Sequence, residues 1–306
     1  MKDVASRFRI ANINALSPSI AGYDVAVGSF ILVAGRLGDV FGHKRIFLIG
    51  LGWSAVWSLI AGASYYSTRP VFVVSRALQG VGAALTLPTS LELLRVISPA
   101  GTPKGVVFAL YTAMPSVGLV VGVLGASTFA RLVWWPWTYW AFSLILFVVG
   151  VIGCLSIPSG PHAASVHPGA WTTILTLDIP GMVTGAMCLG LFGFAWGQAQ
   201  VAGWQHVYLW IILIMSLVLS GLFVMIEACY APRPLIPYSA LSSEVFWILV
   251  AMGCCWSSLG IWSFYAWQYV EHTQSASPLL VSYMMRNIAI TSANSRPVRP
   301  RHTSLP

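Results

Sequence analysis

Arg76 is the residue of this sequence that could carry chemistry most directly, because it lies inside a long apolar stretch. It stands in the segment RALQGVGAA, with Gln79 three residues later and Gly80 beside it. A guanidinium in hydrocarbon costs about 3 kcal/mol, so such an arginine usually faces a polar cavity, where it can hold a substrate or act on a proton site. The alternative is that Arg76 lies near the start of its helix and extends outward to the interface. Gly80 is expected to let a neighbouring helix approach.

A second motif, GRLGDVFGHKR, covers Gly35–Arg45 between two apolar stretches. We expect it to form a cytoplasmic loop in which Gly35 and Gly42 allow a tight turn. Basic side chains such as Lys44 and Arg45 favour the cytoplasmic side of a membrane. Asp39 is the acid of the motif, and it can either cap a helix N-terminus or pair with a neighbouring base.

A third motif places three glycines at short intervals in the segment GLVVGVLG: Gly118, Gly122 and Gly125. Small residues at this spacing let two helix backbones come close together, so a tight helix contact is predicted here.

The elements that hold these residues follow from composition. Of the 306 residues, 57% are hydrophobic and 8% are charged, whereas a soluble domain carries about 25% charged residues. A soluble enzyme, a disordered chain and a disulfide-rich secreted domain are therefore excluded, and an all-α multi-pass membrane protein is predicted. The net charge of +8 comes from residues scattered between apolar runs or near the two ends. With no basic-aromatic patch, nucleic acid is not expected as a partner.

Eight apolar segments qualify, or nearly qualify, as membrane-spanning helices. The first is short and contains Asp24, and the eight are Ile20–Ala34, Ile46–Tyr65, Val71–Leu94, Val106–Phe129, Thr138–Ile157, Leu177–Gln198, Val207–Tyr230 and Val245–Val270. A further stretch, Leu279–Ile290, is too short. One set of connecting loops carries six basic residues against two in the other, which places the first set, including Gly35–Arg45, in the cytoplasm.

No nucleophile-base pair, phosphate-binding loop or metal cluster stands out in the sequence, so neither an enzyme activity nor a cofactor or metal is expected. His162 and His167 could be imagined as metal ligands, but no Cys, Asp or Glu stands near them, and they are read as part of a solvated linker.

Gly35–Arg45 resembles the signature of the major facilitator superfamily, G-x-L-[AG]-D-x-x-G-[RK]-[RK]-[RK], with His43 at one basic position. Arg76, Gln79 and Gly80 are similar to the family's R-x-x-Q-G-x-G motif, whose arginine is associated with proton coupling. Gly118, Gly122 and Gly125 match the antiporter motif G-x-x-x-G-P-x-x-G-G, where Val123 replaces the proline that bends the helix. The whole pattern resembles fungal fourteen-helix drug:proton antiporters.

The resemblance implies an incomplete major facilitator fold, with about eight transmembrane helices plus a stub. Residues 1–157 would form an N-terminal bundle lacking most of its first helix, 158–173 a polar linker and 174–230 a two-helix insert. Residues 231–290 would begin the C-terminal bundle, and 291–306 would be a disordered tail.

The function that the resemblance implies is proton-coupled export of small organic molecules or drugs across the plasma membrane. The partners would be a small-molecule substrate, protons and the lipid bilayer. The alternative is a non-transporting membrane remnant, or a partner of a full-length transporter.

Overall fold

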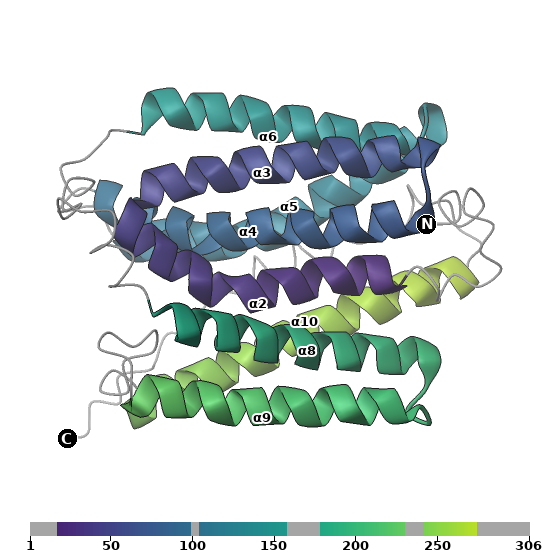
Figure 1. Ribbon diagram of the computed structural model, residues 1–306. Coiled ribbons are helices and arrows are strands. Elements are labelled where there is room, and N and C mark those ends of the chain that lie inside the picture. Colours follow the sequence, from purple (N-terminus) through teal and green to yellow (C-terminus); the bar gives the residue numbers. More distant parts are fainter. Residues whose placement is uncertain (1–16, 99–103, 158–177, 230–241, 274–306) are drawn as a thin grey trace, which may run out of the picture. The chain divides into compact units, whose positions relative to one another are not determined.

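The computed structural model describes residues 17–98, 104–157, 178–229 and 242–273. These residues form eight α-helices and one short 3-10 helix, and none of them lies in a strand. The helices are α2 (Ser17–Phe41), α3 (His43–Ala63), η2 (Ser64–Tyr66), α4 (Arg69–Ile97), α5 (Lys104–Leu132), α6 (Pro136–Ser156), α8 (Ile179–Ala202), α9 (Val207–Cys229) and α10 (Ser243–Thr273). The all-α class predicted from the sequence is confirmed for this part of the chain (Figure 1).

Seven predicted segments agree with helices α3 to α10 to within four residues at each end. The first prediction, Ile20–Ala34, was too short, because α2 continues to Phe41. Hydropathy marks only the apolar part of a helix, whereas backbone hydrogen bonds continue through polar residues. The stretch Leu279–Ile290, the predicted linker 158–173 and the predicted tail 291–306 lie outside the described residues.

Six of the described helices are long and apolar enough to cross a bilayer: α3, α4, α5, α6, α8 and α9. Helix α2 is not one of the six. It has 25 residues, however, and it packs against α3, α4 and α8, which are three of these six helices. Because isolated apolar helices of this length are stable in lipid, the chain is an integral membrane protein.

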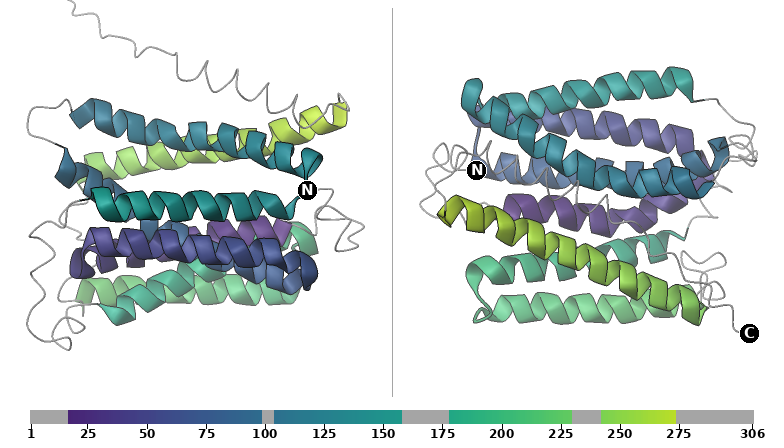
Figure 2. Two further views of the ribbon diagram at one scale, coloured as in Figure 1. Left: turned by 90° about the horizontal axis from the view of Figure 1, so that it is seen from above. Right: turned by 180° about the vertical axis from the view of Figure 1, so that it is seen from behind.

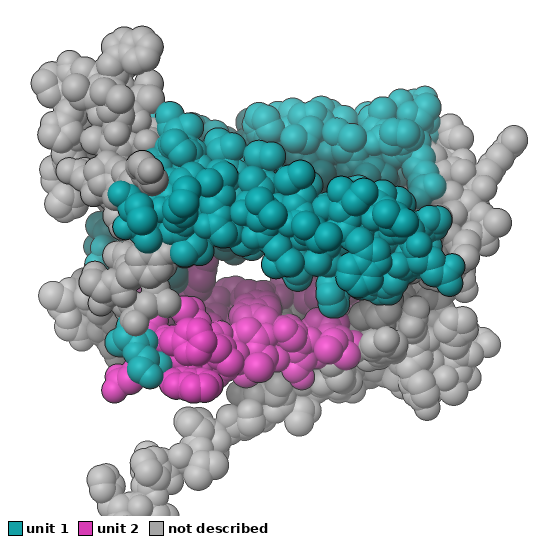
Figure 3. All heavy atoms as spheres, turned by 60° about the horizontal axis from the view of Figure 1, so that its bottom comes forward, with its two compact units in different colours: residues 1–99, 134–243 teal, residues 100–133, 244–306 magenta. Residues whose placement is uncertain are grey.

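The chain divides into two compact units, coloured separately in Figure 3. Unit 1 comprises residues 1–99 and 134–243, and unit 2 comprises residues 100–133 and 244–306. The described helices of unit 2 are α5, which contains Pro115, and α10.

In unit 1 the helices form a row of neighbours, which can be followed in Figure 1 and Figure 2. Helix α4 packs against both α2 and α3, and α3 also packs against α6. On the other side of α2 lies α8, which pairs with α9. Helix α2 therefore joins the α3–α4–α6 group to the α8–α9 hairpin.

Two glycines of α4 let the helices on either side come close. A Cβ at Gly82 would lie 2.8 Å from the carbonyl oxygen of Gly50 on α3. A Cβ at Gly80 would collide with the carbonyl oxygen of Tyr23 on α2 and would lie 3.0 Å from the Ala26 Cβ. The close approach expected at Gly80 is confirmed, and its partner is α2.

A second glycine-rich contact joins α8 to α2. A Cβ at Gly193 would lie 2.7 Å from Val25 Cγ2, and one at Gly197 would lie 3.2 Å from the Ala21 Cβ. One turn further along, a Cβ at Gly190 would lie 3.2 Å from the Ser29 hydroxyl. We call Gly190, Gly193 and Gly197 the α8 glycine seam; it fits the α8–α9 hairpin onto α2.

Aromatic side chains fill the ends of α3, α4 and α6 that lie away from the Gly35–Arg45 motif. Trp135 and Phe72 are buried there, and Tyr65, Trp134 and Tyr139 pack against them. The ring centroids of Tyr65 and Trp134 are 4.5 Å apart in an edge-to-face arrangement. Such a belt is typical of the level at which a helix bundle meets the membrane surface.

Candidate functional site

Arg76 projects from α4 into the space between α2 and α6. Its guanidinium carbon lies 4.6 Å from the centroid of the Tyr23 ring on α2 and 5.8 Å from that of the Tyr139 ring on α6. A guanidinium over an aromatic face is attracted by the negative face of the ring. The side chain therefore points toward neighbouring helices and does not extend away along the lipid surface.

A hydrogen-bonded chain continues from Arg76 into the interior of unit 1. The Arg76 Nη1 donates to Oε1 of Gln79, one turn later on α4. The Gln79 Nε2 donates in turn to the hydroxyl of Ser58 on α3, over 2.6 Å. Gln79 is only 2% exposed and Ser58 is fully buried, so each depends on the other to satisfy its polar atoms.

We call Arg76, Gln79, Ser58, Tyr23 and Tyr139 the Arg76 network. Arg76, Gln79 and Gly80 were candidates from the sequence, and the structure brings them together, with Gly80 holding α2 close. The sequence did not single out the other members of the network. An inward hydroxyl or tyrosine on a neighbouring helix carries no motif, because its role depends on how the helices pack.

The Gly35–Arg45 motif is not wholly a loop, which corrects the prediction. Gly35 and Asp39 lie within the last turns of α2, and Lys44 and Arg45 lie in the first turn of α3. Only Gly42 interrupts the helices, with φ at 92°, a backbone conformation that favours glycine. The tight turn predicted between the two helices is thus made by one glycine.

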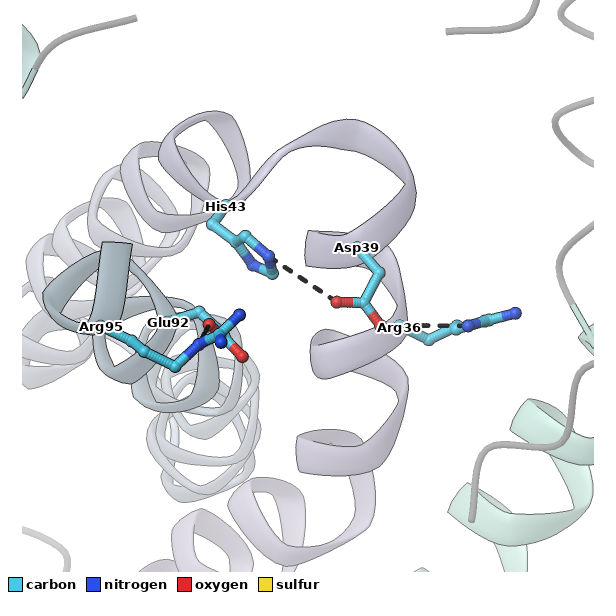
Figure 4. A network of polar contacts seen from close by, with 5 residues as sticks. All are labelled: Arg36, Asp39, His43, Glu92 and Arg95. Carbon is cyan, nitrogen blue, oxygen red and sulfur yellow. Dashed lines mark hydrogen bonds and ion pairs between the residues drawn. The ribbon is translucent and has the colours of Figure 1, made fainter. Parts of the chain in front are cut away.

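Asp39 pairs with bases and does not cap α3. Its carboxylate lies 3.9 Å from Nη1 of Arg36 and 3.7 Å from Nε2 of His43, as Figure 4 shows. The N-cap of α3 is Gly42, with no side-chain hydrogen bond. A Cβ at Gly38 would lie 2.6 Å from Nδ1 of His43, so the pairing depends on a glycine at position 38.

Lys44, in the first turn of α3, contacts the C-terminal end of α6. Its ammonium group donates to the carbonyl oxygens of Cys154, over 3.1 Å, and of Ile157. These carbonyls lie at the C-terminus of α6, where the helix dipole is negative and four carbonyls lack partners within the helix. Arg45, the next residue, is exposed.

A separate ion pair lies near the end of α4, also drawn in Figure 4. The Arg95 Nε donates to Oε2 of Glu92 over 2.6 Å.

The three glycines of the antiporter motif lie on α5, in unit 2. Gly118 and Gly122 are exposed and Gly125 is half-buried. No described atom lies within 4 Å of the place where a Cβ would stand on any of them. The close helix contact and the role of these glycines stay predictions.

Among the described residues, no group of three or more His, Cys, Asp or Glu side chains could hold a metal ion. The cysteines of this part are free thiols. His162 and His167 lie outside the described residues.

The fold and this network define a class: a multi-pass α-helical membrane protein with a cationic network among its helices. The sequence profile of the Major Facilitator Superfamily matches residues 14–300. The chain belongs to the major facilitator superfamily.

Curated relatives support the same family. The chain is 39% identical over 288 residues to the "Low affinity ammonium transporter" of Saccharomyces cerevisiae, covering 94% of this chain and 56% of that protein. It is 34% identical over 295 residues to "Efflux pump terG" of Aspergillus terreus, covering 95% and 55%. It is 39% identical over 207 residues to "Major facilitator superfamily multidrug transporter mdr3" of Aspergillus fumigatus, covering 67% and 38%. The chain spans about half the length of the first two of these relatives.

Proposed function

We propose that this protein takes part in proton-coupled export of small organic molecules across the plasma membrane. Several relatives are named as efflux pumps or as a multidrug transporter. The proposed mechanism is alternating access, in which two helical bundles rock around a site near the membrane midplane. Such transport moves a solute and makes or breaks no covalent bond, so no catalytic residue is assigned.

The observation that supports this proposal best is the environment of Arg76. A guanidinium among membrane helices costs about 3 kcal/mol or more, which a purely structural position would avoid. Arginine has five N–H donors, and the described residues offer Arg76 one side-chain acceptor, Gln79. Donors therefore remain for a carboxylate or a polar substrate group, and we assign the Arg76 network to coupling or substrate binding.

The other motifs receive proposed roles in the same mechanism. Asp39 and its basic neighbours would stabilise the cytoplasmic junction of α2 and α3 in one of the conformations of the alternating-access cycle. Gly118, Gly122 and Gly125 would receive a closely packed helix in the working transporter.

A second candidate is a membrane protein that does not transport, or a partner of a full-length transporter. Alternating access needs walls from two bundles, and a partner chain would supply one of them.

The experiment is an efflux assay in a host whose own drug exporters are deleted. The 306-residue chain is expressed alone, and also together with the complementary half of a full-length relative; accumulation of a fluorescent lipophilic cation is then measured with and without an uncoupler. Uncoupler-sensitive extrusion in either strain supports the proposed function. Extrusion only in the second strain supports the second candidate, in which a partner chain is needed. If neither strain extrudes the cation, the proposed export function is contradicted.

A further inference from the structure

The Arg76 guanidinium contacts two tyrosine rings that belong to different helices. Its central carbon is 4.6 Å from the centroid of the Tyr23 ring on α2 and 5.8 Å from that of the Tyr139 ring on α6. Aromatic faces attract a cation through the ring quadrupole, and this attraction does not use up its N–H donors. The two rings therefore stabilise the charge, while the donors that Gln79 does not occupy stay available.

The Tyr139 ring is itself held by two buried aromatic side chains. Phe72 lies one turn before Arg76 on α4, and its ring centroid is 5.7 Å from that of Tyr139, with the ring planes at 85°. Trp135, one turn before Tyr139 in the chain, lies 6.2 Å away with the planes at 89°. Edge-to-face pairs at such separations are favourable. Phe72 and Trp135 are buried, so they fix the orientation of the Tyr139 ring.

The stretch of α6 that carries Tyr139 is also fixed on α3. The next residue, Trp140, lies against Gly62, where an added Cβ would be 2.6 Å from the Trp140 Cδ1. One turn after Tyr139, the Ser143 hydroxyl donates to the carbonyl oxygen of Ala55 over 2.7 Å. Both the backbone and the ring of Tyr139 are therefore held by contacts that do not involve Arg76.

Contacts from three helices converge on this one guanidinium. Phe72 and Arg76 are four residues apart and lie on the same face of α4, and Tyr139 touches both of them. Tyr23 approaches from α2, and Gln79 accepts a hydrogen bond within α4. An arginine side chain loses much rotamer entropy when it is fixed, so its placement depends on such contacts. Tyr139 is the contact through which α6 takes part.

We propose that Tyr139 is a positioning residue of this protein, whose ring holds the Arg76 guanidinium between α2 and α6 by a cation–π contact. Tyr139 acts through Arg76 and has no substrate contact of its own in this role. Phe72 and Trp135 serve the same role indirectly, because they hold the Tyr139 ring. The inference deepens the proposed function, and it rests on that function only where its effect on transport is concerned.

The first test is a double-mutant cycle on thermal unfolding of the full 306-residue chain in one detergent. Tyr139→Leu, Arg76→Gln and the double variant are compared with wild type. Tyr139→Leu should lower the unfolding temperature by about 2 °C more in the Arg76 protein than in the Arg76→Gln protein, because only the former loses a cation–π contact. Tyr139→Phe keeps the ring and should keep the coupling to Arg76.

The matched control is Trp140→Leu, one residue further along α6. The Trp140 ring packs against the rings of Trp134 and Trp137. Its loss should lower the unfolding temperature by the same amount in the Arg76 and Arg76→Gln proteins. This control separates the loss of a large buried ring from the loss of its contact with a charge.

A second measurement keeps the fold intact if Tyr139→Leu does not fold. Phenylalanine and its mono-, di- and trifluorinated forms are placed at position 139, since fluorine withdraws electron density from the ring face while the size of the ring changes little. The unfolding temperature should fall with each added fluorine in the Arg76 protein and should fall less in Arg76→Gln. Equal slopes in the two backgrounds, or additive losses in the mutant cycle, would overturn the inference.

An efflux arm connects the contact to transport. In the uncoupler-sensitive assay described above, Tyr139→Leu should lower the initial rate by about three- to tenfold at equal abundance, and Tyr139→Phe should restore most of it. A Tyr139→Phe protein as slow as Tyr139→Leu would contradict a role of the ring. If wild type shows no uncoupler-sensitive efflux, the proposed function fails, whereas the unfolding measurements still decide whether Tyr139 positions Arg76.

Discussion

Lys44 Nζ donates a hydrogen bond of 3.1 Å to the carbonyl oxygen of Cys154, so the first turn of α3 is joined to the last turn of α6. The same ammonium group also binds the carbonyl oxygen of Ile157, just beyond that turn. Positive charge at a helix C-terminus is favourable. A basic residue of the Gly35–Arg45 motif therefore has a structural role besides its influence on orientation.

This relationship predicts different effects for two adjacent basic residues. Lys44→Met should lower the free energy of unfolding by about 1.5–3 kcal/mol, because charged hydrogen bonds to the α6 carbonyls are lost. Arg45→Met removes the same charge from an exposed position and should change stability by less than about 0.5 kcal/mol. Thermal unfolding of the purified proteins in one detergent compares the two. Equal losses would mean that the contacts of Lys44 do not stabilise the protein.

The α8 glycine seam predicts a direct cross-link. An added Cβ at Gly197 would lie 3.2 Å from the Ala21 Cβ, close to the separation of about 3.5–4.5 Å found in disulfides. The double variant Ala21→Cys, Gly197→Cys, in a background without the native cysteines, should therefore form a disulfide under mild oxidation. The control pairs Ala21→Cys with Gly221→Cys on α9, and it should remain reduced. Failure of the first pair, or equal oxidation of both, would show that α8 does not pack on α2 in this register.

Packing at the same seam predicts a loss of stability. Gly193→Val places a branched side chain where a Cβ would already lie 2.7 Å from Val25 Cγ2, and such overpacking costs about 1–3 kcal/mol. At Gly221, where no described atom lies within 4 Å of an added Cβ, the same change should not lower the unfolding temperature. A Gly193→Val protein as stable as the Gly221→Val protein would contradict the close contact.

Much of the fold could be predicted from the sequence, because apolar runs of about 20 residues require helices in lipid. The C-terminal end of α2 could not be predicted, because hydropathy does not report where a helix ends. The backbone break needs only Gly42, and Gly35 is accommodated within the helix. The motif that contains both residues was nevertheless recognised.

The candidate site was predictable in part. Contacts within one helix follow from the sequence, whereas contacts between helices depend on how the helices pack. Arg76 and Gln79 are one turn apart on a single helix, so their proximity follows from helix geometry. Ser58, Tyr23 and Tyr139 reach Arg76 from other helices, and their placement depends on which helix faces which. The sequence showed Asp24 as an interruption in an apolar segment.

The charge bias of the loops predicts the orientation in the membrane. Single cysteines introduced by His43→Cys and Ser67→Cys lie at opposite ends of the α3–η2 segment. In a cysteine-free background, an impermeant thiol reagent added to intact cells should label position 67 and not position 43. Labelling of position 43 from outside, with position 67 protected, would reverse the orientation.

The central claim, that the Arg76 network serves transport, is tested most directly by uncoupler-sensitive efflux of Arg76 variants. The assay uses the chain together with the complementary half of a full-length relative, with all variants at equal abundance in the membrane. Arg76→Ala should reduce the initial rate of efflux by about tenfold or more, corresponding to at least about 1.4 kcal/mol. Arg76→Lys should restore only part of that rate, because lysine keeps the charge but lacks the planar set of donors. Wild-type efflux by the Arg76→Ala protein would contradict the claim and leave Arg76 with a structural role.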